Sequence, residues 1–579
     1  MSRLKKVWTE NEGKCRESGK QITRQLRRFA EEGVHGRNND KDGEIPEIEL
    51  LEDAFTHFKT RYDRINGGFA SAPKFPTAVN LKFLLNLGQW PETIKDIVGD
   101  DECKEAQDMA LHTLKSMSKG GIRDQIGHGF CRYSVTKDWS LPHFEKMLYD
   151  EAQLLDVYLD AFLLTNDSEV ADAMRDIADF LTSPPVAATS GGFYSSEDAD
   201  SLPSRDAHEK REGAFYVWTN EDFKEILGAE DSDVLARYYG VLPDGNVNPS
   251  NDPHGELVGQ NVLKICYTIP SLAKELDLSE SKIANIVNTG RQRLLEHRDA
   301  NRPRPSLDDK IVVCWNGLAI SALARTASAL QGREPAASIK YRKAALSAAD
   351  FIKRELYDEN ERQLYRVFRL GRSDTVGVCE DYAFLIQGLI DLYEATFDDE
   401  HLHFADELQK VQLDRFWDKD GAGGFFTTGS PHPPDILLRL KNGMDSAEPS
   451  SNSASARNLW RLSGILEDET YANAAKETLM AFEAELEQFP FTFANMLYSV
   501  AIGRLGLKNI VLSGDIKEHE KILGGLRGRV RPNTTVVALD EGKGTWLKER
   551  NPILKEVKID VPQVMVCKDH ACQIGAQHI

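Results

Sequence analysis

Apolar positions recur along most of the chain with the 3.6-residue period of an α-helix. Some segments are apolar nearly all round, as buried helices are; they cover residues 77–89, 147–165, 315–330, 380–396, 453–466 and 491–505. Amphipathic segments with one charged face alternate with them, over residues 104–118, 168–183, 279–298, 337–357, 399–417 and 469–487. This alternation predicts a closed ring of helical hairpins, with the apolar helices inside and the amphipathic helices outside.

Pairs of glycines followed by an aromatic or β-branched residue mark connections within this ring. They occur at Gly67–Gly68, Gly120–Gly121, Gly191–Gly192 and Gly423–Gly424. Glycine accepts the positive φ of a tight turn, and the residues after it favour short strands. The predicted repeat unit is therefore an outer helix, a short β-loop and an inner helix.

The two ends of the chain differ from this repeat. Residues 1–46 predict a charged helical lead-in, and residues 47–507 carry the helical ring. After Gly506 come two strand-like runs, "NIVLSG" and "TTVVAL", with a helical stretch between them. Residues 508–579 therefore predict a small α/β appendage.

The charge excludes some partners. Asp and Glu number 92 against 71 Lys and Arg, a formal net charge of −21, whereas nucleic acids and anionic membranes require a basic face. No apolar run reaches the length of about 18 residues that a membrane span needs, and the basic start lacks the apolar core of a secretory signal. The eight cysteines are mostly isolated, as reduced thiols are. We expect a cytoplasmic protein.

Polar clusters precede or begin the apolar helices. They are "PHFEKMLYD", "LDDKIVVCWNG", "VGVCEDYAF" and "GMDSAEPSSNS". Because the inner helices of a hairpin ring all run the same way, these clusters are expected to meet at one mouth. Helix N-termini there offer free N–H groups and partial positive charge to a polar ligand.

The stretch from Gly127 to Asp150 carries the densest chemistry. Imidazole titrates near neutral pH, so two histidines are candidates for general acid and base, with a carboxylate beside them: His128, His143 and Glu145. Others would bind hydroxyls or stack on a sugar: Arg132, Tyr133, Trp139, Lys146 and Asp150. The alternative is helix capping by Pro142 and Glu145, which leaves the histidines and Trp139 unexplained.

Further candidates lie in three other segments. The segment "SSEDADS" contains Asp198, a candidate catalytic carboxyl, and Asp200, a candidate ligand contact; Glu212 further along is another candidate ligand contact. Closely spaced carboxylates raise one another's pKa. The alternative is a solvated acidic loop. Glu380 and Asp381 are the remaining catalytic candidates, with helix N-capping as the alternative. The remaining binding candidates are Asp309, Lys310, Trp315, Asn316, Tyr382, Asp445 and Asn452.

Metal and cofactor signals are weak. The acidic loop lacks the glycine and distal glutamate of a calcium-binding EF-hand. Cys567 and Cys572 flank His570 but lack two further zinc ligands, so two ordinary thiols are expected rather than zinc or a redox pair. No phosphate-binding loop, dinucleotide fingerprint or hydrolase elbow occurs. We expect no metal and no cofactor.

The motifs together carry a family resemblance. "GGFASAPKFP", "GGIRDQIGHGFCRYSVTKDWSLPHFEKMLYD", "GGFYSSEDADS", "EGAFYVWT", "CWNGLAISALA" and "EDYAFLIQGLIDLYEAT" closely resemble the spermatogenesis-associated protein 20 family of thioredoxin-domain proteins. The resemblance implies a thioredoxin-like domain followed by an (α/α)6 barrel similar to six-hairpin glycosidases and N-acylglucosamine 2-epimerases. This chain begins where that domain would end, without a CxxC near its start, so a redox function is not expected.

The sequence thus predicts an all-α fold, an (α/α)6 barrel of helical hairpins with short β-loops, plus a small C-terminal α/β appendage. The predicted function is acid–base chemistry on a sugar-like small molecule at the barrel mouth, by an epimerase or isomerase or by a glycoside hydrolase. The alternative is a non-catalytic barrel that binds a sugar or a protein segment. Three side chains discriminate: His143, Glu145 and Asp381 would face one point in an enzyme and be held by caps and salt bridges in a binder.

Overall fold

An inner ring of six helices forms the centre of the computed structural model, which describes residues 2–32, 44–421, 423–434, 436–568 and 571–575. In chain order these helices are α3 (Ala78–Asn86), α6 (Leu148–Thr165), α12 (Val313–Leu330), α14 (Cys379–Thr396), α16 (Ser451–Leu466) and α19 (Met496–Leu505). Each packs against the next. The ring closes where the Asn86 side chain of α3 donates to the Tyr498 hydroxyl of α19 at 2.8 Å.

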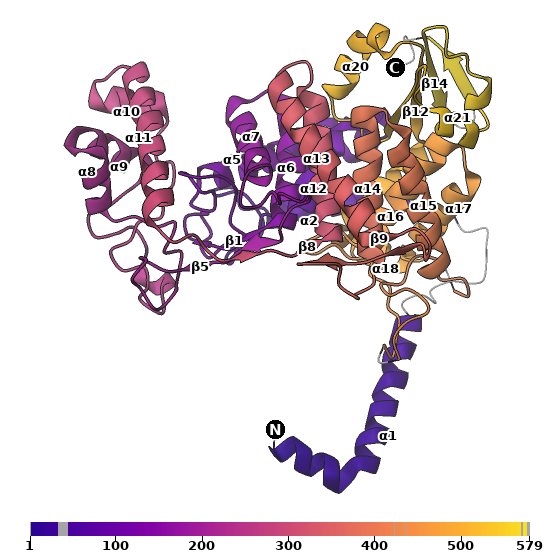
Figure 1. Ribbon diagram of the computed structural model, residues 1–579, viewed down its shortest axis with the longest axis horizontal. Coiled ribbons are helices and arrows are strands. Elements are labelled where there is room, and N and C mark those ends of the chain that lie inside the picture. The colour runs from indigo at the N-terminus through magenta and orange to yellow at the C-terminus, as the bar shows by residue number, and fades with distance from the viewer. Residues whose placement is uncertain (1, 33–43, 422, 435, 569–570, 576–579) are drawn as a thin grey trace.

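An outer layer covers this ring (Figure 1). It consists of α2 (Leu50–Arg61), α5 (Asp100–Lys119), α7 (Ser168–Leu181), α13 (Pro335–Leu356), α15 (Asp399–Arg415) and α17 (Glu469–Met480). The (α/α)6 barrel predicted from the alternation of helices is confirmed. Short elements join the hairpins: η1 (Leu87–Gln89), α4 (Glu92–Val98), η2 (Pro249–Asn251), α18 (Glu483–Gln488) and η3 (Pro490–Phe493).

Small residues let the inner helices approach closely. A Cβ added to Gly317 of α12 would lie 2.5 Å from a backbone carbon of Phe384 on α14, and one on Gly388 of α14 would lie 2.7 Å from the Gly317 oxygen. Real Cβ atoms do not come so near, so these two positions require glycine. The all-round apolar pattern of both helices is therefore the pattern of segments enclosed on every side.

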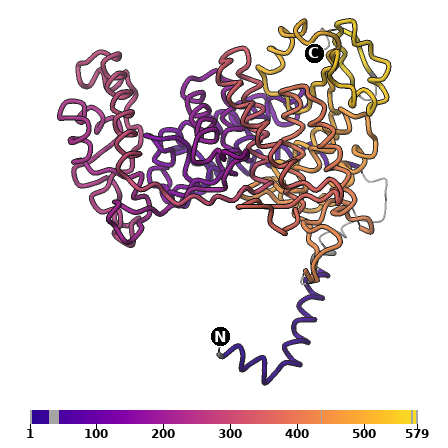
Figure 2. The backbone as a smooth tube through the Cα atoms, viewed as in Figure 1, coloured from indigo at the N-terminus to yellow at the C-terminus, as the bar shows by residue number. Residues whose placement is uncertain are grey.

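One predicted outer helix lies elsewhere. The amphipathic segment 279–298 forms α11 (Glu280–Asn301), which packs with α8 (Asn220–Leu227), α9 (Ala229–Tyr239) and α10 (Ile269–Leu276) around a separate apolar core. The prediction that this helix belongs to the outer ring is wrong, and the sixth helix of the outer layer is α2 instead. The four helices stand beside the barrel as a distinct unit (Figure 2).

The paired glycines make turns that inner-helix side chains hold. At 67–68, 191–192 and 423–424 both glycines have positive φ, as predicted. The side chain of Asn316 on α12 bonds both the N–H and the C=O of Phe193, and that of Asn452 on α16 does the same for Phe425. This shared clamp is structural evidence for the internal repeat.

The pair at 120–121 departs from the pattern, since neither glycine has positive φ. Close approach explains it instead: an added Cβ would lie 2.6 Å from the Trp139 oxygen and 2.2 Å from the Ser140 oxygen, respectively.

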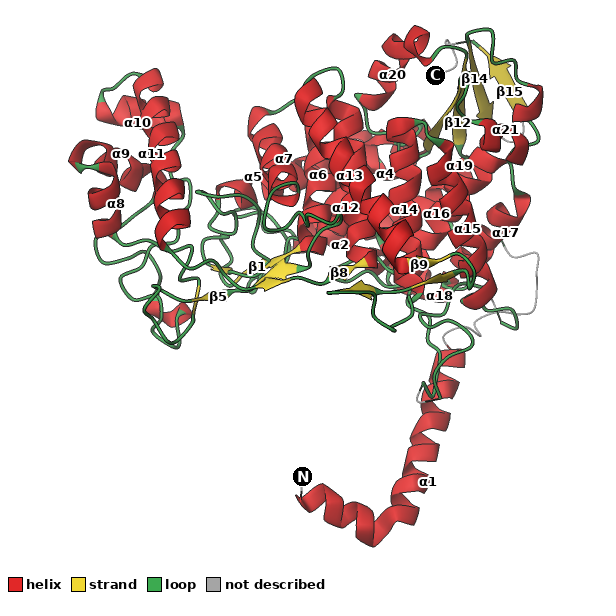
Figure 3. Cartoon of the chain, viewed as in Figure 1, coloured by secondary structure: helices red, strands yellow, loops and turns green. Residues whose placement is uncertain are grey.

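Two-residue strands gather at one end of the barrel (Figure 3). They are β1 (Tyr133–Ser134), β2 (Pro142–His143), β3 (Lys146–Met147), β4 (Ser196–Glu197), β5 (Asp200–Ser201), β6 (Arg211–Glu212), β7 (Leu307–Asp308), β8 (Ile311–Val312), β9 (Tyr357–Asp358), β10 (Gln363–Leu364) and β11 (Val367–Phe368). β3, β4 and β7 form one sheet and the others pair in twos. These strands are the predicted short β-loops.

The tail is a four-stranded mixed sheet in the order β13-β12-β14-β15. Its elements are β12 (Lys508–Ser513), η4 (Ile516–His519), α20 (Glu520–Arg527), β13 (Thr534–Leu539), α21 (Thr545–Arg550), η5 (Leu554–Glu556), β14 (Gln563–Lys568) and β15 (Ala571–Ile574). β12 and β13 pack on α16, and the Ala538 N–H donates to the Tyr393 hydroxyl of α14 at 3.2 Å. The predicted α/β appendage is thus present, opposite the β-loops (Figure 1).

Cys567 and Cys572 form a disulfide between the paired strands β14 and β15. The expectation of two ordinary thiols is therefore wrong; β pairing places the two residues directly opposite each other, which the spacing alone did not reveal. His570 lies outside the described residues.

Helix α1 (Ser2–Glu32) projects away from the barrel (Figure 1). Residues 33–43 of the predicted lead-in lie outside the described part of the chain. The boundaries at residues 47 and 507 stay predictions. Among the described helices, none has both the length and the apolar run needed to cross a membrane.

Candidate active site at the barrel mouth

The barrel encloses a lumen to which every inner helix contributes. A cavity of about 40 Å³ lies within it, bounded by Ala78, Val79, Lys82, Ala152, Gln153, Asp156, Val157, Leu318, Ser321, Gln387, Pro449, Arg457, Asn495 and Tyr498. Most of these residues lie within the first two turns of an inner helix or directly before it. The helices therefore point their N-termini toward one mouth, as the parallel arrangement of a hairpin ring requires.

Two carboxyl groups beside the N-termini of inner helices have buried oxygens without partners. Asp150 lies in the first turn of α6, and Glu448 lies just before α16. In the described part of the chain, neither Asp150 Oδ2 nor Glu448 Oε1 has a hydrogen-bond partner. Burial, assisted by the charge of Glu380, raises the pKa of Glu448 to about 8. Burial also raises the pKa of Asp150 well above its ordinary value, and Glu448 adds to the rise.

Aromatic rings lie beside these carboxyls. The rings of Tyr149 and Trp315 are 5.2 Å apart and tilted by 54°. The Trp315 indole N–H favours the ionised form of Glu448 and so opposes the rise of its pKa. The Gln153 amide donates to the Ala447 oxygen at 2.8 Å, which ties the segment carrying Glu448 to α6.

Glu380 and Asp381 share one arginine. Arg366 contacts Glu380 at 2.6 Å and Asp381 at 2.8 Å. Asp381 is fully buried and also accepts from the N–H groups of Val378 and Cys314. It therefore caps α14, which was the alternative, and has no surface to offer a substrate. Glu380 keeps about a third of its side chain exposed and stays a candidate.

His143 is held between two glutamates. Its Nδ1 lies 2.6 Å from Glu212 Oε1 and its Nε2 lies 3.7 Å from Glu145 Oε2, while Tyr133 stacks on the ring. The contacts with Glu145 and Glu212 raise the pKa of His143 to about 9. Glu145 also contacts Arg132 at 3.3 Å. His143 is thus an imidazolium at neutral pH, not a free base.

The alternative of helix capping by Pro142 and Glu145 is wrong for α6. Pro142 lies in β2, and α6 begins at Leu148, so neither Pro142 nor Glu145 belongs to its first turn. The carboxylates in that turn are Asp150 and Glu151.

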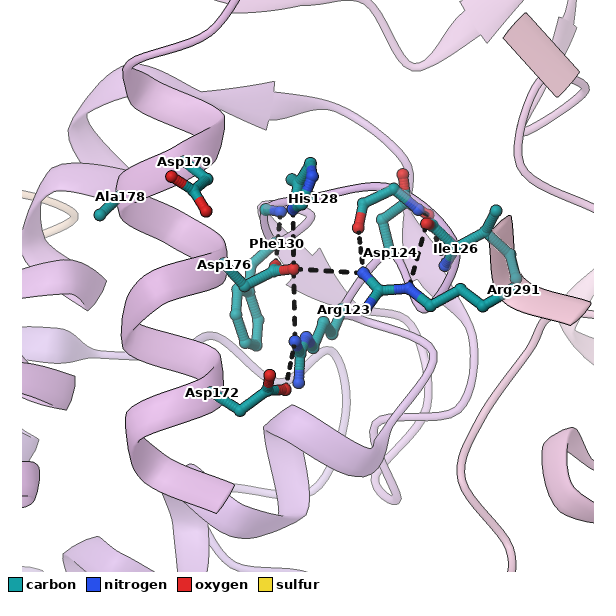
Figure 4. A network of polar contacts seen from close by, with 12 residues as sticks. Arg123, Asp124, Ile126, His128, Phe130, Asp172, Asp176, Ala178, Asp179 and Arg291 are labelled. Carbon is teal, nitrogen blue, oxygen red and sulfur yellow. Dashed lines mark hydrogen bonds and ion pairs between the residues drawn. The ribbon is translucent and has the colours of Figure 1, made fainter. Parts of the chain in front are cut away.

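His128 belongs to a different network, centred on Asp176 of the outer helix α7 (Figure 4). Its Nδ1 lies 3.0 Å from Asp176 Oδ1, which Arg123 and Arg291 also contact at 3.3 and 3.4 Å. Arg291 comes from α11 and donates to the Gly127 oxygen at 2.7 Å. This network joins the four-helix unit to the barrel, and the structure does not bring His128 to the carboxyls at the mouth.

The predicted residues of the acidic segment also lie in different surroundings. Asp198 contacts Lys210 at 3.1 Å, and Asp200 is exposed in β5, opposite Glu212 in β6. Of this group only Glu212 reaches the His143 cluster. Asp309 contacts Arg369 at 2.5 Å, and the Lys310 ammonium contacts Asp308 at 2.9 Å. No three His, Cys, Asp or Glu side chains of the described residues are arranged to hold a metal ion.

Several predicted ligand contacts are wrong because the side chains are buried and occupied by protein groups. Trp139 is fully buried and its indole donates to the Asn66 oxygen at 2.8 Å. Lys146 donates to Asp124 and to the His128 oxygen. The Leu364 N–H donates to the Tyr382 hydroxyl.

The same correction applies to both asparagines, Asn316 and Asn452, which clamp the glycine turns. Asp445 accepts from the Ser450 and Asn495 N–H groups at the starts of α16 and α19. Burial raises the pKa of Asp445 to about 6, but its partners are those of a helix cap.

Curated relatives match nearly the whole chain. Spermatogenesis-associated protein 20 of Homo sapiens is 36% identical over 99% of this chain. The protein of the same name from Mus musculus is also 36% identical over 99%. This chain belongs to the spermatogenesis-associated protein 20 family. It spans 73% of the length of each of these two relatives. An uncharacterized protein of Caenorhabditis elegans is 35% identical over 90% of this chain and 71% of its own length. No family model matches.

Solved structures of several enzymes are distantly similar to this family member. A sugar epimerase from a ruminal bacterium is 13% identical, covers 76% of this chain and 98% of its own, and has a TM-score of 0.29. A family 76 mannosidase from Bacteroides thetaiotaomicron is 10% identical, covers 76% and 99%, and has a TM-score of 0.40. Similarities with such low TM-scores and identities do not indicate a reaction for this chain.

The sequence interpretation missed Glu448 and Arg366. Glu448 lies in a Ser- and Pro-rich segment with no helical period, and it faces the mouth only because that segment folds over α6. Arg366 lies in a β-loop whose sequence has no motif. A signal was present deeper in the lumen: charged residues interrupt otherwise apolar inner helices at Asp156, Arg325 and Arg457.

Proposed function

We propose that this protein is a carbohydrate-active enzyme that works by proton transfer at the barrel mouth, as a glycoside hydrolase with Glu448 as its general acid. The observation that carries the proposal is the pair of buried carboxyl oxygens without partners, Glu448 Oε1 and Asp150 Oδ2. Buried polar groups are almost always satisfied within the protein. Other buried atoms of the described residues also lack partners, but Glu448 and Asp150 are the two whose pKa the burial raises beside the aromatic pair of Tyr149 and Trp315, and we take them as the groups that meet a ligand.

The raised pKa of Glu448, about 8, keeps this carboxyl protonated at neutral pH. A protonated carboxyl can donate to a glycosidic oxygen as the bond breaks, which is the role of the general acid in glycoside hydrolysis. Trp315, which is partly exposed and rests against Tyr149, supplies an apolar face on which a sugar ring can pack. Glu380, paired with Arg366, is the candidate for the second carboxyl.

The contacts of the two histidines make an epimerase or isomerase the weaker hypothesis. Such a reaction needs two proton-transfer groups on either side of one sugar carbon. The Nδ1 atoms of His143 and His128 contact Glu212 and Asp176, respectively, and His128 lies in a separate network. A hydrolase requires neither histidine as a base.

A non-catalytic sugar-binding barrel is the second candidate. It is favoured by His143, Glu145 and Asp381, which are held in mutual salt bridges and a helix cap rather than facing one point. In a sugar-binding barrel Asp150 and Glu448 would donate hydrogen bonds to sugar hydroxyls without transferring a proton.

A glycoside screen separates these candidates. The full chain is incubated with mono-, di- and oligosaccharides, and the anomeric proton signals are followed by NMR. A hydrolase produces new reducing-end signals, an epimerase or isomerase converts a monosaccharide, and a binder raises the melting temperature without turnover. Glu448→Gln should abolish hydrolysis while sugar binding persists. Neither turnover nor a change in melting temperature with any sugar would overturn the proposal.

A further inference from the structure

The far end of the lumen is a chamber rich in arginine. It is bounded by the inner helices and by the loop before β13, and its cavity volume is about 80 Å³. Its lining is Lys82, Ser321, Arg325, Gln387, Asp391, Glu394, Arg457, Arg461, Leu507, Arg529, Arg531, Pro532 and Thr534. Four of these residues also bound the space below the mouth, so the two spaces adjoin: Lys82, Ser321, Gln387 and Arg457.

Cations outnumber carboxylates here. The cationic lining residues are Lys82, Arg325, Arg457, Arg461, Arg529 and Arg531. The carboxylates that pair with them are Asp156, Asp160, Asp391 and Glu394. Arg529 is exposed, so five partly or fully buried cationic side chains meet four carboxylates. An enclosed excess of positive charge is costly unless an anion offsets it.

The excess is located at Arg457 and Arg531. In the described part of the chain Arg457 makes no ion pair within 4 Å, its Nε has no hydrogen-bond partner, and its guanidinium lies over the Tyr498 ring at 5.0 Å. Asp391 and Asp160 act on it only at longer range. Burial lowers the pKa of Arg457, and Arg461 lowers it further, as expected for a cation short of a counter-charge. Arg531 contacts Glu394 at 3.3 Å, but its Nη1 has no partner.

We propose that this chamber binds a small oxyanion, a phosphoryl or sulfuryl group, between Arg457 and Arg531. The planar guanidinium fork matches the oxygens of such groups and forms two parallel hydrogen bonds to them. Gln387 offers a neutral amide donor on the same wall, since only one of its two N–H bonds is used, toward Ser321 Oγ. The site gives the C-terminal tail a role, since Arg529 and Arg531 belong to it.

The oxyanion is not the group that reacts at the mouth. Arg457 follows the first residue of α16 by six residues, which at the rise of an α-helix is about 9 Å from the end of the helix near Glu448. Free phosphate and the phosphate of an extended sugar phosphate would meet the same guanidinium groups. The evidence for this site lies in the chamber alone, and the site does not depend on the reaction proposed for the mouth.

The test is calorimetric titration and thermal unfolding of the full chain with sodium phosphate, sodium sulfate, glucose 6-phosphate and trehalose 6-phosphate. Sodium chloride at equal ionic strength is the reference. Phosphate or sulfate should raise the melting temperature to a plateau. Tighter binding of trehalose 6-phosphate than of phosphate would identify a sugar phosphate as the source; equal or weaker binding would identify the free anion.

Arg457→Met tests the site directly. It should weaken anion binding at least tenfold, yet raise the melting temperature in phosphate-free buffer because an unpaired buried charge is removed. Arg531→Gln is the second variant and should weaken binding several-fold. Arg354→Met, at an exposed arginine of α13, is the control and should bind like the wild type.

The proposal is overturned if none of the anions exceeds chloride, or if the variants at Arg457 and Arg531 bind phosphate as the wild type does. Glu448→Gln should bind phosphate unchanged, so failure of the proposed mouth chemistry would leave this result intact.

Discussion

Replacing Glu448 with glutamine should stabilise the protein in alkaline solution. The pKa of Glu448 rises from an ordinary 4.5 to about 8, mainly through burial. At about 1.4 kcal/mol per unit, this difference corresponds to roughly 5 kcal/mol. The Glu448 side chain is only partly buried, so solvent reduces the cost of its charge, and we expect about 2 kcal/mol.

The sign follows from proton release. Between pH 4.5 and about 8 the unfolded state has lost the Glu448 proton while the folded state retains it, so this group lowers stability as the pH rises. Below 4.5 both states are protonated, and above about 8 both are ionised. The gain from Glu448→Gln should therefore be near zero at the acidic end and reach its full value above pH 8.

Urea unfolding at pH 5, 7 and 9 measures this difference. Glu359→Gln, at an exposed glutamate in the turn after β9, is the matched control and should follow the wild type at every pH. If Glu448→Gln unfolds at the same urea concentration as the wild type at pH 9, or at a lower one, Glu448 is not a strained buried acid and the reasoning fails.

Three further changes test the scaffold. Arg366→Met leaves the buried Asp381 carboxylate without its cation and should cost about 3 kcal/mol in urea unfolding, with Arg366→Lys in between. His143→Asn removes the ion pair with the partly exposed Glu212 and should lower the free energy of unfolding by about 1 kcal/mol at pH 6. The loss should fade as the pH rises through about 9, the pKa of His143. A loss that grows with pH would contradict the ion-pair account. Asn316→Ala removes both bonds that hold Phe193 and should cost about 2 kcal/mol; an unchanged unfolding midpoint would refute the clamp.

The sequence predicted the barrel because an inner helix is enclosed on every side and its whole surface is apolar. The segment 315–330 corresponds closely to α12, for example. Amphipathic helices are less informative, because a single apolar stripe looks the same whichever core it covers. For that reason 279–298 was assigned to the outer ring although α11 packs on its own unit.

The site was harder to predict because capping residues and ligand-binding residues are of the same types. Asp381 and Asn452 are polar and begin inner helices, yet one caps α14 and the other clamps a turn. Asp150 was predicted as a ligand contact and does lie at the mouth. Its partner Glu448 depends on a fold of the loop that no local pattern encodes.

The pH dependence of turnover tests the central claim most directly. With a glycoside that the wild type hydrolyses, kcat should fall as the pH rises through about 8, where Glu448 loses its proton. Glu448→Gln should retain the fold but lose at least a hundredfold in kcat, as expected when a general acid is removed. A wild-type profile that stays flat through pH 8, together with full activity of Glu448→Gln, would contradict the account.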